Sequence, residues 1–117
     1  MTLKQKQHNY YFGLFAELVA SWYLKLHLYK IINHRFKSPF GEIDIVAKRN
    51  NQLVFIEIKA RKDTSLMDFI SKRQQLRINK AAEYFLKIHP KYKACEIRFD
   101  AIIVNKYFWP KHFKNYW

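Results

Sequence analysis

The sequence predicts an α/β domain in which a mixed β-sheet is flanked by helices. Three observations support this: a helical apolar pattern near the start, two adjacent strand-like stretches joined by a turn, and a second helical stretch followed by another strand. Elements in this order bury their apolar faces best as a sheet with helices packed against it. With 117 residues the chain is long enough for one hydrophobic core and short for two, so residues 1–117 are expected to form a single domain.

The first predicted element is an amphipathic helix from Asn9 to about Leu28. Its apolar residues recur at steps of three and four, as on one face of a helix. They are Tyr11, Leu14, Phe15, Leu18, Val19, Trp22, Tyr23 and Leu26. Glu17 lies inside this helix.

A short strand within residues 29–36 follows, and residues 37–41 form a turn. Glu42 to Lys48 and Leu53 to Ala60 are the two strongest strand candidates. The residues between them, 49–52, include two asparagines, which tolerate the left-handed backbone of tight turns. We therefore expect an antiparallel hairpin.

The second half of the chain predicts one more helix and one more strand. Ser71 and Gln74 match a capping box at the start of the helix, which ends before Pro90. Residues 96–104 form the last predicted strand, and the pattern of the basic and aromatic tail, about 105–117, defines no element. The buried stripe of the helix is expected to be Leu76, Ala81, Ala82, Phe85 and Leu86.

The register of the hairpin decides which side chains meet. A turn centred on the two asparagines places Asp44 directly opposite Glu57, and Glu42 opposite Lys59 on the same face. A loop of odd length would instead separate the acids. The other face is then continuously apolar and is expected to carry Ile43, Ile45, Val54, Ile56 and Ile58.

Two acids directly opposite each other destabilise a sheet unless something offsets their repulsion. A divalent cation such as Mg²⁺ or Mn²⁺ would do so, because it binds one or two carboxylates plus water and a substrate phosphate. With Lys59 beside them, Asp44 and Glu57 have the chemistry of metal-assisted phosphodiester hydrolysis. The alternative is that these charges form only the solvated face of a half-exposed hairpin. Three of the nine acidic residues fall in this hairpin, which favours a site.

Asp44, followed after twelve residues by Glu57-Ile58-Lys59, resembles the PD-(D/E)xK nuclease signature. Four blocks in order also resemble the YraN family of small bacterial proteins, itself similar to Holliday-junction resolvases and restriction endonucleases. The blocks are Gly13-x-x-Ala16-Glu17, Gly41-Glu42-Ile43-Asp44, Val54 to Lys59 and Arg98-Phe99-Asp100. The resemblance implies a restriction-endonuclease-like fold and a metal-dependent endonuclease acting on DNA, for instance on branched or junction DNA.

The same resemblance implies roles for individual residues. Asp44 and Glu57 would bind Mg²⁺ or Mn²⁺, Lys59 would act beside the attacking water, and Glu17 would be an additional metal or water ligand. Without the resemblance, Glu17 is equally well explained as a solvent-facing helix residue. Related nucleases carry a lysine or glutamine on the second helix, where this chain offers Arg73, Gln74 and Gln75. Arg98 and Asp100 are expected to form a structural pair.

The charge balance points to a polyanion as partner. Twenty-two Lys and Arg against nine Asp and Glu give a net charge of +13, and clustered cations bind phosphates by releasing counterions. The residues expected to contact nucleic acid are Arg61, Lys62, Lys72, Arg73, Gln75 and Arg77. The tail adds three cations, Lys106, Lys111 and Lys114, and two aromatic residues, Trp109 and Tyr116. The aromatic rings are expected to serve in base stacking, in packing or in a homodimer contact. Alternatively, the positive charge only keeps the protein in solution.

Two further functions remain open: a non-catalytic nucleic-acid-binding accessory protein on the same fold, and a small RNA-binding protein. Other classes are excluded by what the sequence lacks, which includes zinc-ligand spacing, a glycine-rich phosphate loop and a serine nucleophile elbow. Cys95 is the only cysteine, which fits a reducing cytoplasm. Neither a signal peptide nor a membrane-spanning stretch is expected.

Overall fold

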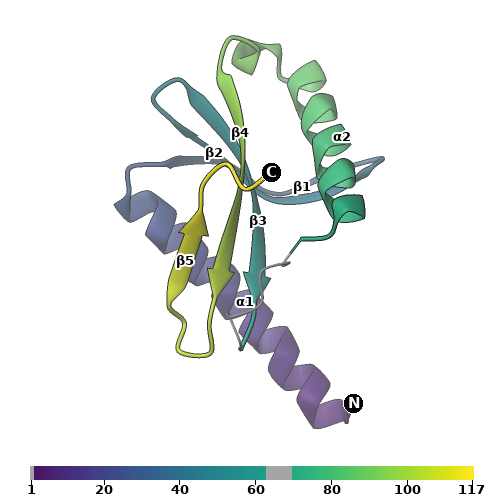
Figure 1. Ribbon diagram of the computed structural model, residues 1–117, viewed down its shortest axis with the longest axis vertical. Helices are drawn as coiled ribbons and strands as arrows, with labels where there is room; N and C mark the ends of the chain where they lie inside the picture. Colours follow the sequence, from purple (N-terminus) through teal and green to yellow (C-terminus); the bar gives the residue numbers. More distant parts are fainter. Residues whose placement is uncertain (1, 63–69) are drawn as a thin grey trace.

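A five-stranded mixed sheet with a helix on each face forms the framework of the protein (Figure 1). The computed structural model describes residues 2–62 and 70–117. In chain order the elements are α1 (Leu3–Leu26), β1 (Lys30–Ser38), β2 (Gly41–Arg49), β3 (Gln52–Ala60), α2 (Lys72–Ile88), a 3₁₀ turn (Pro90–Tyr92), β4 (Glu96–Val104) and β5 (Pro110–Phe113).

The strands lie in the order in which they occur in the sequence, from β1 to β5. All neighbours are antiparallel except β3 and β4, which are parallel. A parallel pair needs a long crossover, and here the segment that contains α2 supplies it. The chain is therefore an α/β domain of the restriction-endonuclease-like type, as predicted.

Helix α1 begins six residues earlier than the apolar pattern predicts, at Leu3 instead of Asn9. A capping box explains the early start: the Thr2 hydroxyl accepts a hydrogen bond from the Gln5 amide at 3.1 Å, and the Gln5 side chain accepts one from the Thr2 amide at 2.9 Å. Such reciprocal bonds satisfy backbone donors that a helix start otherwise leaves unpaired. Figure 1 shows that the first turns of α1 extend past the sheet.

The face of α1 that packs on the sheet also differs from the prediction. Its buried residues are mostly small: Phe12, Ala16, Ala20, Ser21 and Leu24. Small side chains let the helix approach the strands closely, so the large residues point outward. Five members of the predicted stripe are exposed, namely Tyr11, Phe15, Leu18, Trp22 and Leu26.

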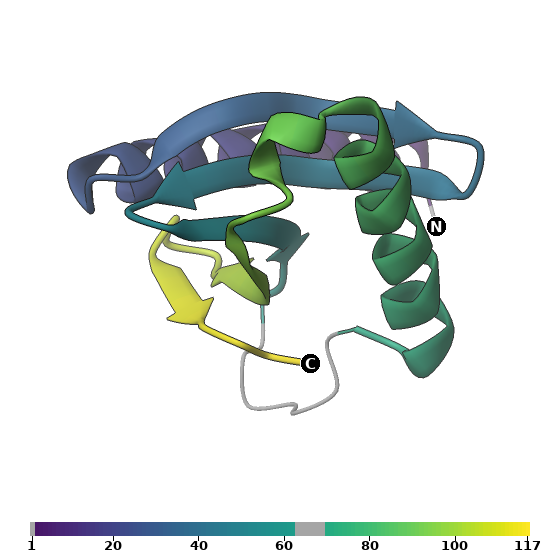
Figure 2. The same ribbon diagram turned by 90° about the horizontal axis from the view of Figure 1, so that it is seen from above.

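Both faces of the sheet are covered, so the prediction of one apolar and one charged face is wrong. Residues of α1 share one core cluster with Ile45, Val54, Ile56 and Ile58. Residues of α2 share the other, which includes Leu53 and Phe55 of β3. Figure 2, seen from above, shows α1 on one side of the strands and α2 on the other. Because β3 is apolar on both sides, it is a central, doubly buried strand.

The tail is part of this fold. Its strand β5 pairs with β4, and the Tyr116 amide donates to the Phe99 carbonyl at 2.8 Å. Trp117 stacks on Phe99 with 5.3 Å between ring centroids and donates from its indole nitrogen to the Asn79 side chain at 2.9 Å. These contacts join the end of the chain to the α2 side of the sheet.

Asp100 anchors the tail from the α1 side. Its fully buried carboxylate accepts hydrogen bonds from Arg98 at 2.8 Å, from the Asn115 amide at 2.9 Å, and contacts the His112 ring at 2.7 Å. Burial alone would raise the pKa of Asp100, but the bonds to His112, Arg98 and Asn115 outweigh it and lower that pKa. The predicted structural role of the Arg98–Asp100 pair is thus confirmed.

Across the described ranges, no helix has both the length and the apolar character needed to cross a membrane.

Candidate active site

The hairpin of β2 and β3 has the predicted register. The pairs run from Arg49–Gln52 next to the turn to Ile45–Ile56, and Asn50 in the turn adopts a positive φ of 54°. Counted from the turn, regular pairing stops at Ile45, one residue short of Asp44. The position where the acids meet is therefore the place where the two strands begin to separate.

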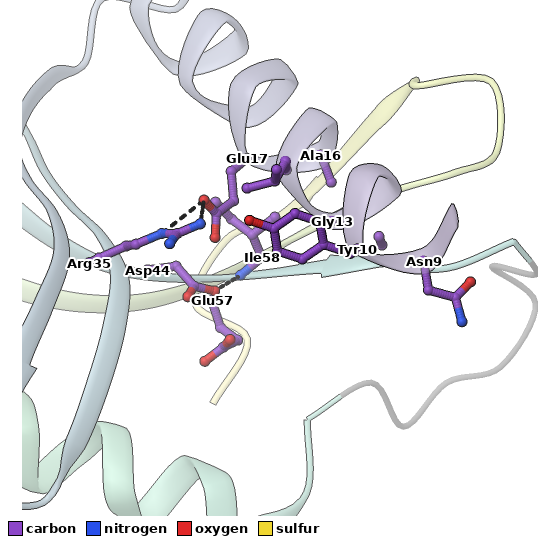
Figure 3. A pocket seen from close by; sticks show the side chains of 11 residues that line it. Asn9, Tyr10, Gly13, Ala16, Glu17, Arg35, Asp44, Glu57 and Ile58 are labelled. Carbon is purple, nitrogen blue, oxygen red and sulfur yellow. Dashed lines mark hydrogen bonds and ion pairs between the residues drawn. The ribbon is translucent and has the colours of Figure 1, made fainter. Parts of the chain in front are cut away.

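The Asp44 side chain accounts for that separation. Its Oδ2 accepts a hydrogen bond of 2.8 Å from the backbone amide of Ile58, so a carboxylate oxygen takes the place of a strand carbonyl (Figure 3). The alternation of side chains also shifts here, because Ile45 belongs to the α1 cluster whereas Ile43 belongs to the α2 cluster. The prediction that both isoleucines share a face is wrong for this reason.

Glu57 is the neighbour of Asp44 across the two strands. It is 7% exposed, on the side of β3 that also carries Leu53 and Phe55. Burial, the hydrogen bond with Asp44 and the negative charge of Asp44 together raise the pKa of Glu57 to about 9, against the opposing charge of Lys59. At neutral pH the two acids therefore hold a proton between them.

Both acids line a hollow of about 320 Å³ whose other lining residues come from α1, β1 and β3. Lys59 lines a second hollow, of about 560 Å³, together with Arg61 and Lys62. The two hollows share four lining residues, which are Asn9, Gly13, Ile58 and Ala60. The predicted acids and the predicted lysine thus occur in one continuous depression.

Glu17 reaches the first hollow from α1, but its carboxylate is engaged by Arg35. The guanidinium of Arg35 donates to Oε2 of Glu17 at 2.8 and 3.2 Å, and Figure 3 shows this pair beside Asp44 and Glu57. Hydrogen bonding to Glu17 raises the pKa of Arg35. Sequence reasoning missed Arg35, because it lies on β1 and its approach to Glu17 depends on how α1 packs.

Within residues 2–62 and 70–117, no three His, Cys, Asp or Glu side chains come close enough together to hold a metal ion. The carboxylates that meet are those of Asp44 and Glu57. Oxygen donors suit Mg²⁺ and Mn²⁺, and two carboxylates are enough where water and a substrate phosphate complete the shell. The donor set therefore fits a hard divalent cation.

The remaining predicted residues do not line the hollow that contains the two acids. Glu42 was expected opposite Lys59, but that prediction is wrong, because the pairing of β2 with β3 ends at Ile45–Ile56. On its other edge Glu42 pairs with Lys37 of β1. On the second helix, Ser71 caps the start by accepting from the Gln74 amide at 3.1 Å. Gln75 donates from its side chain to the Ile70 carbonyl at 3.2 Å.

The predicted nucleic-acid contacts divide into two groups. Arg61 and Lys62 line the hollow that contains Lys59. The other four are outside the residues that line either hollow; they are Lys72, Arg73, Gln75 and Arg77, all on α2.

Comparison with known proteins gives one consistent family. The model of the uncharacterised protein family UPF0102 matches residues 16–104. A UPF0102 protein of Bartonella tribocorum is 37% identical over 110 residues, which cover 93% of this chain and 85% of that protein. Relatives in Nitrobacter winogradskyi and Ehrlichia ruminantium are each 42% identical, covering 86% and 90% of this chain and 86% and 82% of their own lengths.

The matched residues include every member of the candidate site, from Glu17 on α1 to Lys59 on β3. The chain therefore belongs to the UPF0102 family, which is the YraN family that its sequence blocks resemble.

Proposed function

We propose that the protein is a Mg²⁺- or Mn²⁺-dependent endonuclease that hydrolyses phosphodiester bonds in DNA. The observation that carries this proposal is the meeting of Asp44 and Glu57 in a hollow, at the point where β2 and β3 separate. Holding two acids together in a largely buried position costs free energy. A bound cation would offset the repulsion between the two acids, and an anionic substrate would bind to that cation.

Each residue has a distinct part in the proposed reaction. Asp44 and Glu57 would hold the cation, which supplies positive charge beside the phosphate and makes a bound water more acidic. Lys59 would orient or deprotonate the water, or stabilise charge on the phosphate. Water adds to phosphorus, one P–O ester bond breaks, and the leaving oxygen takes up a proton.

The hydrogen bond between Asp44 and the Ile58 amide contributes by positioning. It uses Oδ2 of Asp44, and Oδ1 would bind the cation once the proton shared with Glu57 is displaced. Because Ile58 lies between Glu57 and Lys59, the same bond fixes the backbone that carries both side chains. A catalytic group held by the framework in this way loses little entropy when substrate binds.

Cleavage of branched, flapped and linear DNA with and without Mg²⁺ or Mn²⁺ tests the proposal. Asp44→Asn, whose amide oxygen can still accept from Ile58, and Glu57→Gln should each lower the cleavage rate by at least about 100-fold. Glu42→Gln is the matched control, since this acid is in the same hairpin but exposed, and it should cleave within about twofold of wild type. Equal cleavage by Asp44→Asn and wild type would reject the site.

A second candidate is a non-catalytic DNA-binding protein on the same fold. It is favoured by the Arg35–Glu17 ion pair, which engages the carboxylate that would otherwise be the third ligand. Salt-dependent DNA binding without cleavage in either metal would support this candidate over the endonuclease.

A further inference from the structure

The depression that contains the proposed site continues past Lys59 to an aromatic surface. The hollow lined by Lys59, Arg61 and Lys62 shares Phe12 and Lys62 with a third hollow of about 250 Å³. This third hollow lies between α1 and the loop from β4 to β5. Three connected hollows thus form one groove along the first half of α1, which we call the α1 groove.

Exposed aromatic rings line the far end of the α1 groove. Tyr11 and Phe15 on α1 are 57% and 52% exposed, and Phe108 in the loop is 44% exposed. The ring of Phe108 packs edge-on against Phe12 and Phe15, with centroid distances of 5.8 and 5.7 Å. The rings are therefore held in place while part of their surface stays open to solvent.

The loop that carries Phe108 is also ordered by its own contacts. The Asn105 side chain accepts hydrogen bonds from the amides of Tyr107 at 2.9 Å and Trp109 at 3.0 Å. Phe108 itself has a φ of 59°, a conformation that is costly for a bulky residue. The exposed ring is thus presented by a constrained backbone.

The positive charge around these aromatic rings favours an anionic ligand. His8, Lys62 and Lys106 surround the rings, and Lys59 and Arg61 line the hollow next to them. Among the described residues that line these two hollows there is no aspartate or glutamate. A second copy of the chain, with the same excess of positive charge, would be repelled there, whereas an anionic partner is attracted.

We propose that the α1 groove binds an unpaired strand of DNA, whose bases stack on Phe15 and Phe108 while its phosphates contact Lys59, Arg61, Lys62 and Lys106. Aromatic rings interleaved with cations are the surface that single strands require, since every base offers a flat face and every linkage a negative charge. This inference rests on the proposed function for the choice of DNA as ligand. It adds that the substrate contains unpaired nucleotides beside the bond that is cleaved.

Fluorescence anisotropy without divalent metal tests the inference. The probes are a labelled single strand of about twenty nucleotides and the same strand in a blunt duplex. Phe15→Ala and Phe108→Leu, which keeps apolar volume but removes the ring, should each weaken single-strand binding by about 5- to 100-fold and duplex binding by no more than about twofold. Trp22→Ala is the control, because Trp22 is 65% exposed on the same helix but outside the α1 groove.

Unchanged single-strand binding in both variants, or an equal loss in Trp22→Ala, would overturn the inference. The inference would also be overturned if Phe15→Ala kept single-strand binding but lost self-association. The same holds if it kept single-strand binding but lost binding to vesicles of phosphatidylglycerol and phosphatidylethanolamine. Because the assay contains no metal, a protein that cleaves nothing can still pass it, and a protein that cleaves DNA can still fail it. The two proposals are therefore tested separately.

Discussion

Among the described residues, Glu57 is the acid whose surroundings most oppose its charged form. Burial, the hydrogen bond to Asp44 and the charge of Asp44 raise its pKa from 4.5 to about 9. In the unfolded chain the carboxyl keeps an ordinary pKa. Folding therefore favours the protonated acid, and the stabilisation that this gives is complete below about pH 4.5 and is lost as the pH rises toward 9.

Substituting Glu57 should consequently stabilise the metal-free protein at high pH. We expect Glu57→Gln and wild type to be similarly stable near pH 5, and the variant to gain on the order of 3–5 kcal/mol relative to wild type by about pH 9. Denaturant unfolding at a series of pH values in the presence of a chelator measures this difference. A difference that stays constant across that range would show that Glu57 is not held in a protonated state.

Glu17 gives a second prediction at this scale. Its ion pair with Arg35 is partly exposed, with side-chain exposures of 34% and 51%, so it contributes little to folding stability. If Glu17 assists the site through water, Glu17→Gln should lower the cleavage rate by about 10- to 100-fold, less than Asp44→Asn does. Thermal unfolding should change by only a degree or two. Full cleavage activity in Glu17→Gln would show that Glu17 takes no part in the reaction.

The sequence predicted Asp44 and Glu57 as neighbours because hairpin register follows from the length of the turn and the asparagines within it. It did not predict that the Asp44 carboxylate would bind the Ile58 amide and end the pairing. The difference arises because alternation describes regular strands, and a side chain that replaces a backbone acceptor interrupts them. The placement of Arg35 beside Glu17 could not be predicted either, since it depends on contacts between elements far apart in the chain.

Among the secondary structure elements, α1 is the one whose packing departs most from expectation. Apolar residues surround it, so their spacing indicated a helix but could not identify its buried face. Ala16 and Ala20, at 1% and 0% exposure, mark that face, and their small size sets the distance from helix to sheet. A pattern of small residues every four positions was the available signal.

Enlarging one of these alanines should therefore be costly. Ala20→Leu is expected to destabilise the protein by about 1–3 kcal/mol, because a larger side chain cannot fit between α1 and the sheet without displacing one of them. The same change at Ala94, which is exposed in a turn, should alter stability by less than about 0.5 kcal/mol. Urea unfolding of the two variants makes the comparison, and equal stabilities would contradict the close packing of α1.

The other elements show where sequence patterns suffice, although the prediction that Leu76 of α2 is buried is wrong, since Leu76 is 54% exposed and Ile78 is buried instead. The strands of the hairpin and the cap of α2 at Ser71 were predicted correctly, because turn and cap residues act locally. The start of α1 was missed although its capping box is present in the sequence at Thr2 and Gln5. Strand β5 could not be predicted from its own residues, since the four residues Pro110–Phe113 become a strand only by pairing with β4.

For the whole molecule, the net charge of +13 should appear as a strong dependence of DNA binding on salt. Four cations line the α1 groove beyond the acids, so the logarithm of single-strand affinity should fall with the logarithm of salt concentration with a slope of about −3. Lys62→Ala should reduce the steepness by about 0.7, whereas Lys30→Ala, at a position that lines none of the three hollows, should leave it unchanged. An identical slope for Lys62→Ala and wild type would place the bound strand elsewhere.

The central claim is that Asp44 and Glu57 together form a cation site. Titration of the protein with Mn²⁺ by calorimetry, in two buffers with different ionisation enthalpies near pH 7, tests it most directly. We predict one bound ion per chain and the release of about one proton, because the ion displaces the proton that Glu57 holds at this pH. Glu57→Gln should bind far more weakly and release none. Absence of binding, or binding that is equal in Glu57→Gln and releases no proton, would contradict the account.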